Sequence, residues 1–592
     1  MQDTLPPRWD LSDLFDGLDD PSIEQTFADQ AAAANTFASA YRGKINQATI
    51  NPPFLAKAIS DYEHLLQELA KPSMYAQLRF SVETTNAAVG ALLQNVRTRT
   101  VEIQQTLLFF ELEIAAVSEI ILNTLIQSPE LAHYKHFLER QRDAKPHRLS
   151  ESEESILTDM SLTASGAWTR FFEQELGRKM FDVTIRNEQK TLNESETLHL
   201  LHDADRDTRR SAAESLTRGL TQELPRITFI YNTLILDKRL DDTRRRFQTS
   251  EASRHLENEI DGTVVDALVA AVTGRMNTVR QFYAWKQKRL GLTELFDYDR
   301  YAPLKPPRAT FSFNASRDLV LNAFEKFSPT FKTLAQTFFD KHWIDGPPSA
   351  GKRGGAFCSY ATPDLHPYVF LNHAGSARDV LTMAHELGHA IHASLARPHG
   401  YLQFSSPLTL AETASIFAEM IVFHDLLDHL DDPEDRIALT AQKIEELFAS
   451  VHRQIAMFGF ERDAHAAYRK QGELTSETVN GFWRAHQTQM FGSSMTLTPG
   501  YDIWWSYVSH FFEYPFYVYA YAFGELLTLS LFARYQKQKT SFVDDYVALL
   551  SAGGSASPQA LLAPFGIRLD DPTFWEQGLN LIDALVKQVT TP

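Results

Sequence analysis

Residues 376–396 read SARDVLTMAHELGHAIHASLA, and this stretch decides our interpretation of the whole chain. Ser376 is followed three residues later by Asp379, a pattern typical of the first turn of a helix. Pro398 and Gly400 come shortly after the stretch, and we expect them to end the helix. The sequence therefore predicts one helix over this stretch.

The same helix contains the H-E-x-x-H pattern at His385, Glu386 and His389. Residues four apart lie one above the other on a helix, with Cβ atoms about 5–6 Å apart, so two imidazoles can bind one metal ion. Glu386 lies further round the helix, where it can reach a water beside the ion without binding the ion itself. The alternative is a solvated helix face. We predict a zinc site, because this side of the helix otherwise has the pattern of a buried face.

A catalytic zinc site needs a third protein ligand and one open position. Glu412 is the first carboxylate after His389, and it lies at the start of a second predicted helix. We predict that Glu412 is the third ligand; the alternative is a capping box with Thr409, in which Glu412 only satisfies a backbone N–H. Glu419, two turns further on, is predicted to orient a ligand histidine. His392 has two equally favoured interpretations: its side chain either supports the metal ligands or is simply packed in the core.

Most of the remaining sequence has apolar residues at three- and four-residue spacing, which indicates long helices. A Gly- and Pro-rich run at 346–355 interrupts this pattern. Two short apolar and aromatic runs follow at 355–360 and 368–372, and they predict two strands of a small sheet. The sequence thus predicts a mainly α fold with one small β patch just before the H-E-x-x-H helix.

Composition excludes several classes of protein. The 592 residues carry 57 Lys and Arg against 75 Asp and Glu, a net charge of −18, which argues against nucleic acid or an anionic membrane as a partner. Cys358 is the only cysteine, so no intrachain disulfide is expected, and residues 1–15 lack the pattern of a secretory signal peptide. The segment 514–533 contains Pro515 and Glu525, and we predict a buried helix rather than a membrane span. We expect a cytoplasmic protein.

Several motifs together resemble one known family. The stretch from His385 to His392, followed by Glu412-Thr-Ala-Ser415, is similar to the thimet oligopeptidase and oligoendopeptidase F family of zinc metallopeptidases. Further segments similar to oligoendopeptidase F members are 9–15, 301–304, 352–358 and 510–521. The resemblance spans nearly the whole chain and is strongest over 350–525.

The resemblance implies a zincin-type helical metallopeptidase with a small β-sheet and two lobes around a deep substrate channel. Such a channel admits short, unfolded peptides and excludes folded proteins. We expect an N-terminal helical lobe at 1–195 and the catalytic metallopeptidase domain at 196–592, with the H-E-x-x-H helix near 376–397.

The resemblance also implies roles for individual residues. One Zn²⁺ per chain is held by His385, His389 and Glu412, and Glu386 is the general base for hydrolysis of internal peptide bonds. An edge strand aligns the extended peptide through main-chain hydrogen bonds; its residues are Gly354, Gly355, Ala356 and Phe357. Donors from a late histidine and tyrosine cluster stabilise the oxyanion; His510 and Tyr521 are preferred, with Tyr514 as a further catalytic residue and Tyr517 in substrate binding.

Three alternatives stay open. A peptidyl-dipeptidase of the same family needs a cation for the substrate's terminal carboxylate, and Arg353 and Arg484 are available. A non-catalytic helical protein that binds peptides at a vestigial zinc site belongs to a different class. A helical scaffold for protein partners is a third alternative, although we find no internal repeat.

Overall fold

The computed structural model describes residues 6–304 and 310–591. Within these residues helices dominate, and the strands form one two-stranded and one three-stranded sheet. The predicted mainly α fold with a small β-sheet is therefore confirmed.

The described residues form two compact units, each assembled from separate stretches of the chain. Unit 1 comprises Met1–Glu151, Pro307–His429 and Arg534–Ile567, and unit 2 comprises Ser152–Pro306, Leu430–Ala533 and Arg568–Pro592. These units differ from the two consecutive domains that we predicted, and the expected boundary at 195/196 lies inside one helix of unit 2. The physical reason is that apolar periodicity identifies helices but not which distant helices pack together.

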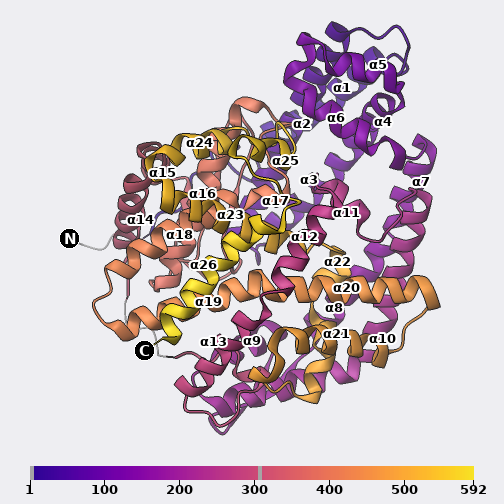
Figure 1. Cartoon of the computed structure of the whole chain (residues 1–592). Coiled ribbons are helices and arrows are strands. Elements are labelled where there is room, and N and C mark those ends of the chain that lie inside the picture. Colours follow the sequence, from indigo (N-terminus) through magenta and orange to yellow (C-terminus); the bar gives the residue numbers. More distant parts are fainter. Residues whose placement is uncertain (1–5, 305–309, 592) are drawn as a thin grey trace. The chain divides into compact units, whose positions relative to one another are not determined.

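Unit 1 contains the H-E-x-x-H helix, which is α16. Its helices are α1 (Pro21–Tyr41), α2 (Pro52–Val82), α3 (Ala87–Leu107), α4 (Phe109–Ala116), α5 (Glu119–Ile126), α6 (Lys135–Ala144), α14 (Phe313–Phe327), α15 (Pro329–Asp340), α16 (Ala377–Ala396), α17 (Leu408–Ala411), α18 (Thr413–Asp428), α24 (Thr540–Ser551) and α25 (Pro558–Leu562). Figure 1 shows α16 and α18 beside one another, and α14, α15 and α24 also pack against α16. Because neighbours cover it on several sides, most residues of α16 are buried.

A three-stranded sheet lies against α16. Its order is β3 (Ile344–Asp345), β5 (Tyr368–Phe370), β4 (Phe357–Ser359), so β5 is central and β4 is an edge strand. Strands β4 and β5 are antiparallel, and β3 and β5 are parallel. The two predicted strands are thus confirmed, although each is shorter than predicted.

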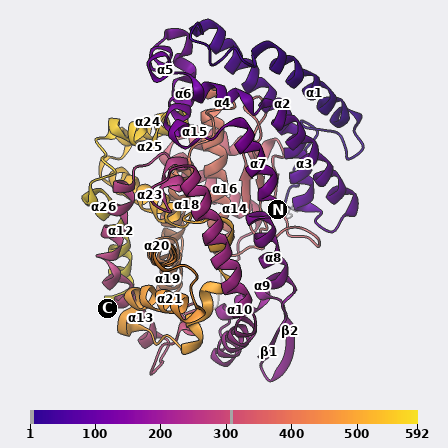
Figure 2. The same cartoon turned by 90° about the vertical axis from the view of Figure 1, so that its right-hand side faces the viewer.

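Unit 2 is built around the 39-residue helix α10 (Arg206–Arg244). Its other helices are α8 (Ser165–Arg178), α9 (Glu194–His199), α11 (Ala252–Glu257), α12 (Gly262–Thr273), α13 (Met276–Arg289), α19 (Pro433–Ser450), α20 (His452–Gln471), α21 (Ser476–Phe491), α22 (His510–Glu513) and α26 (Pro572–Thr590); α7 (Glu151–Ser161) and α23 (Tyr519–Gln538) each cross a boundary between the units. A hairpin of β1 (Phe181–Ile185) and β2 (Glu188–Leu192) packs on α10 (Figure 2).

The hairpin was not predicted from the sequence. Its two-residue turn, Arg186-Asn187, has φ of 48° and 72°. Positive φ at both positions matches the twist of antiparallel strands. The pair Asn-Gly is the usual sequence signal of such a turn, and Arg186-Asn187 does not provide it.

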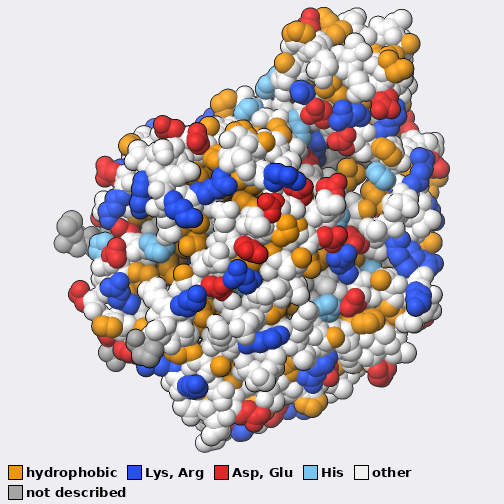
Figure 3. All heavy atoms as spheres, viewed as in Figure 1, with side chains coloured by type: hydrophobic (Ala, Val, Ile, Leu, Met, Phe, Trp, Pro, Cys, Tyr) orange, Lys and Arg blue, Asp and Glu red, His pale blue; other side chains and the backbone are white. Residues whose placement is uncertain are grey.

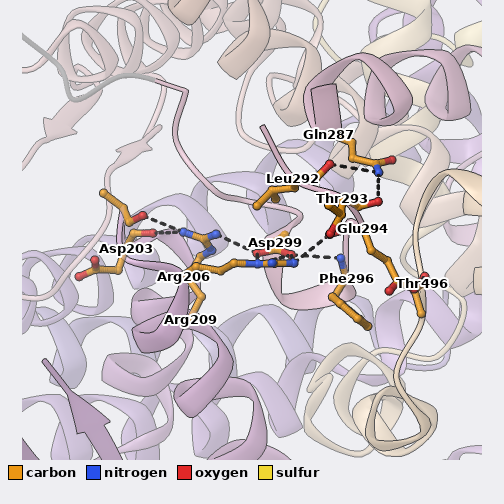
Figure 4. Close-up of polar contacts among 11 residues, drawn as sticks. Asp203, Arg206, Arg209, Gln287, Leu292, Thr293, Glu294, Phe296, Asp299 and Thr496 are labelled. Atoms are coloured by element: carbon orange, nitrogen blue, oxygen red, sulfur yellow. Dashed lines mark hydrogen bonds and ion pairs between the residues drawn. The ribbon is translucent and has the colours of Figure 1, made fainter. Parts of the chain in front are cut away.

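A buried carboxylate fixes the start of α10 to the loop that precedes Tyr301. Asp299 is fully buried and forms ion pairs of 2.7 Å with Arg206 and 2.8 Å with Arg209 (Figure 4). Although burial opposes ionisation, these hydrogen bonds hold the pKa of Asp299 below its usual value. The loop of the 301–304 motif is therefore anchored by charge-assisted hydrogen bonds.

The buried helix predicted at 514–533 begins later than expected. Helix α23 begins at Tyr519 rather than at 514, because Pro515 and Phe516 form a turn in which Phe516 has φ of 60°. Its apolar residues from Phe523 to Phe532 are buried, as predicted. Among residues 6–304 and 310–591, no helix has both the length and the apolar character needed to cross a membrane.

On the face of the molecule in Figure 3, Lys and Arg side chains are interspersed with Asp and Glu. This distribution agrees with the composition, which has an excess of acidic residues and no basic block. A single-sign basic surface, the electrostatic signature of nucleic-acid binding, is not present on that face.

Candidate metal centre and active site

Helix α16 begins where the sequence predicts. The hydroxyl of Ser376 accepts a hydrogen bond from the backbone N–H of Asp379, and the carboxylate of Asp379 accepts from the backbone N–H of Ser376. This capping box satisfies two backbone donors that the first helical turn leaves free. The helix ends at Ala396, and Gly400 follows with φ of 75°.

His385, His389 and Glu412 converge on one point. Their ligand atoms all lie within 4.8 Å of one another. Oε2 of Glu412 is 3.3 Å from Nε2 of His385 and 3.4 Å from Nε2 of His389. Ligands about 2.0–2.1 Å from a tetrahedral zinc ion are separated by about 3.3 Å, so both carboxylate-to-imidazole distances match those of a zinc site.

Glu412 lies in the break between α17 and α18, where its side chain is directed to the histidines. Thr409 lies inside α17, whose N-cap is Pro407, so Thr409 is not the N-cap that a capping box with Glu412 requires. The hydroxyl of Ser415 donates to Oε2 of Glu412 at 2.9 Å and fixes the carboxylate. Although burial opposes ionisation, the hydrogen bonds from His385 and His389 hold the pKa of Glu412 well below its usual value. The geometry thus favours the ligand interpretation over the capping box.

Two more carboxylates lie close to the ligand atoms. Oε2 of Glu419 is 3.2 Å from Nδ1 of His385. Because a carboxylate only accepts, Nδ1–H of His385 is the donor, and Nε2 is left to face the convergence point. Glu386 is 6% exposed, and burial raises the pKa of its carboxyl group above the ordinary value, although both histidines oppose that rise. A raised pKa suits a group that accepts and then donates a proton near neutral pH.

Gly388 lets helices α16 and α18 approach one another, a role that was not predicted from the sequence. A Cβ at this position would lie 2.6 Å from the backbone O of Ala414 and 2.6 Å from Cα of Ser415. Glycine inside a helix costs about 1 kcal/mol relative to alanine, so its presence there is itself a signal of close packing. This close approach brings α18 and its carboxylates next to the two histidines.

His392 lies on the same helix but is directed elsewhere. It is 2% exposed, and its Nε2 is 3.1 Å from the hydroxyl of Ser406. Burial lowers the pKa of His392 to about 4, so the side chain is neutral at physiological pH. These contacts favour the packed core position.

The predicted peptide-aligning segment is only partly a strand. Gly354, Gly355 and Ala356 precede β4, and Phe357 is its first residue. Gly355 has φ of 84°, and the side-chain amide of Asn372 donates to its carbonyl oxygen at 2.8 Å. The three residues before β4 form a turn because this left-handed conformation, which glycine adopts readily, interrupts the extended backbone.

Strand β4 packs against α16, and Tyr360 follows the strand directly. The ring of Tyr360 lies 6.5 Å from that of His389, centroid to centroid. Burial and, to a smaller extent, the charge of Glu386 raise the pKa of the Cys358 thiol well above its usual value, which disfavours the nucleophilic thiolate form.

Unit 2 brings the predicted late residues together. Nε2 of His510 is 3.1 Å from the hydroxyl of Tyr521. The ring of Tyr517 lies 5.9 Å from that of His510 and 5.1 Å from that of Tyr521, and Tyr514 is 6.0 Å from Tyr517. Burial and the charge of Arg453 lower the pKa of His510. We call these four residues the His/Tyr cluster.

Comparisons with known proteins identify the family. A model described as peptidase family M3 matches residues 199–581, and one described as oligopeptidase F matches residues 113–181. Oligopeptidase PepF of Bacillus subtilis is 24% identical over 98% of this chain and 87% of its own length. An oligoendopeptidase F homolog of Borreliella burgdorferi is 25% identical over 98% of this chain and 97% of its own length.

Solved structures share the fold. Oligoendopeptidase F from Enterococcus faecium has a TM-score of 0.71 at 19% identity, covering 96% of this chain and 98% of that one. PZ peptidase A with an inhibitor has a TM-score of 0.74 at 16% identity, covering 96% and 97%. Since the M3 family model alone matches more than half of the chain, this protein is a peptidase and belongs to peptidase family M3.

Proposed function

We propose that this peptidase is a zinc-dependent endopeptidase that hydrolyses internal bonds of short, unstructured oligopeptides. The observation that carries the proposal is the convergence of His385, His389 and Glu412 beside the buried Glu386. Two imidazole nitrogens and one carboxylate oxygen leave a fourth position open, as in catalytic zinc sites. When bound, one zinc ion per chain would supply a Lewis acid that acidifies water and polarises a carbonyl group.

The protein's own side chains then move the protons. Glu386 takes a proton from the water that attacks the scissile carbonyl and passes it to the nitrogen of the leaving amine. Glu419 holds His385 through Nδ1, so that Nε2 of His385 would be available to a bound ion. Ser415 holds the carboxylate of Glu412 in the same way.

The remaining roles are proposals of the same kind. Tyr521 and His510 donate hydrogen bonds to the oxyanion, with Tyr514 and Tyr517 beside them in catalysis and substrate contact; their hydrogen bond and ring contacts support a joint role. The edge position of β4 supports an extended peptide pairing from Phe357 onward, with Gly354, Gly355 and Ala356 contacting the peptide beside the strand. A cytoplasmic location stays a prediction from the sequence.

One observation disfavours the peptidyl-dipeptidase alternative. Arg484 forms an ion pair of 2.5 Å with Asp502 and donates to the backbone O of Leu497, so its guanidinium is already engaged. Arg353 has no structural feature that singles it out. An endopeptidase therefore accounts for the site with fewer assumptions.

The test combines zinc content with cleavage of an internally quenched peptide of about ten residues, in wild type and in Glu386→Gln. We expect one zinc per chain in both proteins and cleavage by the wild type alone. The same peptide with an amidated C-terminus should be cut equally well by an endopeptidase, whereas a peptidyl-dipeptidase needs the free carboxylate. Bound zinc without cleavage in the wild type would identify a binding protein, and absence of zinc would refute the site.

A further inference from the structure

The turn that carries the His/Tyr cluster is held by a buried glutamate on a different helix. Residues 514–518 connect α22 to α23, and Phe516 at the centre of this turn has φ of 60°. Its backbone N–H donates to Oε1 of Glu461, in α20, at 2.9 Å. The hydrogen bond joins two segments that are 55 residues apart in the sequence.

The left-handed conformation of Phe516 needs support. A bulky residue with positive φ is an outlier, because its Cβ crowds the following carbonyl oxygen, and such a conformation persists only where its surroundings fix it. Phe516 is fully buried, with its ring 4.7 Å from that of His465 and 6.0 Å from that of Phe458, centroid to centroid. Ring packing and the hydrogen bond to Glu461 together fix this residue.

Glu461 is fully buried. Burial raises its pKa to about 8, so the side chain is mostly a neutral acid at physiological pH. The two cations whose charges oppose this rise form ion pairs elsewhere, since Arg254 pairs with Glu257 and Lys238 pairs with Asp242. A buried carboxyl group is unfavourable unless it is hydrogen-bonded, and the bond that Glu461 makes is the one to the turn.

A second set of contacts holds the other end of the turn. Asn258, just after α11, donates to the hydroxyl of Tyr519 at 2.8 Å, and Nδ1 of His255 is 3.0 Å from the same oxygen. Arg254 donates to the backbone O of Pro515. Tyr519 begins α23, the helix that carries Tyr521 two residues later, so α11 fixes the start of that helix.

We propose that Glu461 is a positioning residue for the reaction: by holding Phe516 in the left-handed turn, it sets where Tyr517 and Tyr521 stand relative to His510. The proposal rests on the proposed catalytic role of the His/Tyr cluster. Glu461 itself is buried and acts through the backbone of the turn, so it does not touch the substrate. Displacement of an oxyanion donor by about 1 Å lowers kcat about 10²-fold, while substrate binding is less affected.

The experiment compares Glu461→Gln, which retains an oxygen acceptor, with Glu461→Met, which keeps the length of the side chain but removes the acceptor. We expect kcat on the quenched peptide to stay within about 3-fold of wild type for Gln and to fall about 10- to 100-fold for Met, with little change in KM. Zinc content should be equal in all proteins. Gly481→Ala, an exposed helical site with open space, is the control for unrelated substitution.

Coupling to the cluster is measured with a double variant. If Glu461 acts through Tyr521, then Glu461→Met should cost little extra activity in a Tyr521→Phe background, whereas independent effects multiply.

If the Met variant fails to fold, Glu461→Asp replaces it, because one methylene less withdraws the acceptor from the N–H of Phe516. A reduced kcat is expected for Asp as well.

Hydrogen exchange provides a readout that does not depend on catalysis. The amide of Phe516 should be protected in wild type and Glu461→Gln, and should exchange at least about 10-fold faster in Glu461→Met. Unchanged protection would overturn the proposal, and so would lost protection with unchanged kcat. A wild type that cleaves no peptide refutes the proposed function instead, and exchange at Phe516 still decides whether Glu461 holds the turn.

Discussion

Substitution of Gly388 by alanine tests whether the approach of two helices builds the metal centre. The added Cβ would lie 2.6 Å from both the backbone O of Ala414 and Cα of Ser415, about 0.8 Å inside the 3.4 Å of ordinary van der Waals contact. Both obstacles are backbone atoms, so no side-chain rotation relieves the overlap. Helices α16 and α18 must therefore separate locally.

The consequence should appear first in the metal site. Ligand distances in a zinc site tolerate about 0.2 Å, and the separation needed is several times larger. Because Glu412 precedes Ser415 on the displaced segment, its carboxylate withdraws from His385 and His389, and zinc should dissociate more readily. Overpacking of this kind costs about 1–3 kcal/mol in folding free energy, and a displacement near 1 Å costs about 10²-fold in rate.

The assay measures zinc affinity by competition with a chromophoric chelator, urea unfolding of the zinc-free protein, and cleavage of the quenched peptide. Gly481→Ala makes the same chemical change in helix α21, where nothing lies within 4 Å of the added Cβ. That control should gain up to about 1 kcal/mol from helix propensity, with zinc binding unchanged. Wild-type zinc affinity and activity in Gly388→Ala would refute the reasoning.

Three further predictions concern individual side chains. Glu419→Gln should weaken zinc binding about 10- to 100-fold, because His385 loses the carboxylate that orients it; an unchanged dissociation constant contradicts this. Tyr521→Phe should lower kcat roughly 10²–10³-fold with KM and zinc content near wild type, and a change in KM alone would argue for substrate contact instead. Folding raises the pKa of Glu461 from 4.5 to about 8, so the unfolded chain loses this proton at a lower pH than the folded protein does. The contribution of Glu461 to stability is therefore fully present below pH 4.5 and is lost as the pH rises towards 8. Urea unfolding should therefore show Glu461→Gln becoming more stable than wild type by about 1.4 kcal/mol per pH unit between pH 5 and 8; parallel pH profiles would contradict it.

The sequence was sufficient where a local pattern has one structural solution. A helix with a capping box at Ser376 and Asp379 places His385 and His389 on one face whatever surrounds it, because four residues make about one turn. Short aromatic runs between turns predicted β4 and β5 for a similar reason. The expected ligand Glu412 followed from the need for a third donor near the first two.

Tertiary structure decided what depends on residues distant in the chain. The two compact units are discontinuous in sequence, and no periodicity indicates which helices share a unit. Glu461 gives no local signal of its role, since the N–H that it accepts from lies 55 residues away and the left-handed turn at Phe516 is not encoded by glycine. Gly388 needed both sources of information. The sequence shows a glycine inside a helix, where helix propensity disfavours it, and the structure gives the reason, because a Cβ at this position would lie 2.6 Å from the backbone of α18. Spacing along one helix fixes the direction of a side chain, whereas packing sets the distance between two helices. The proposed metal site depends on that distance, because its ligands come from two segments.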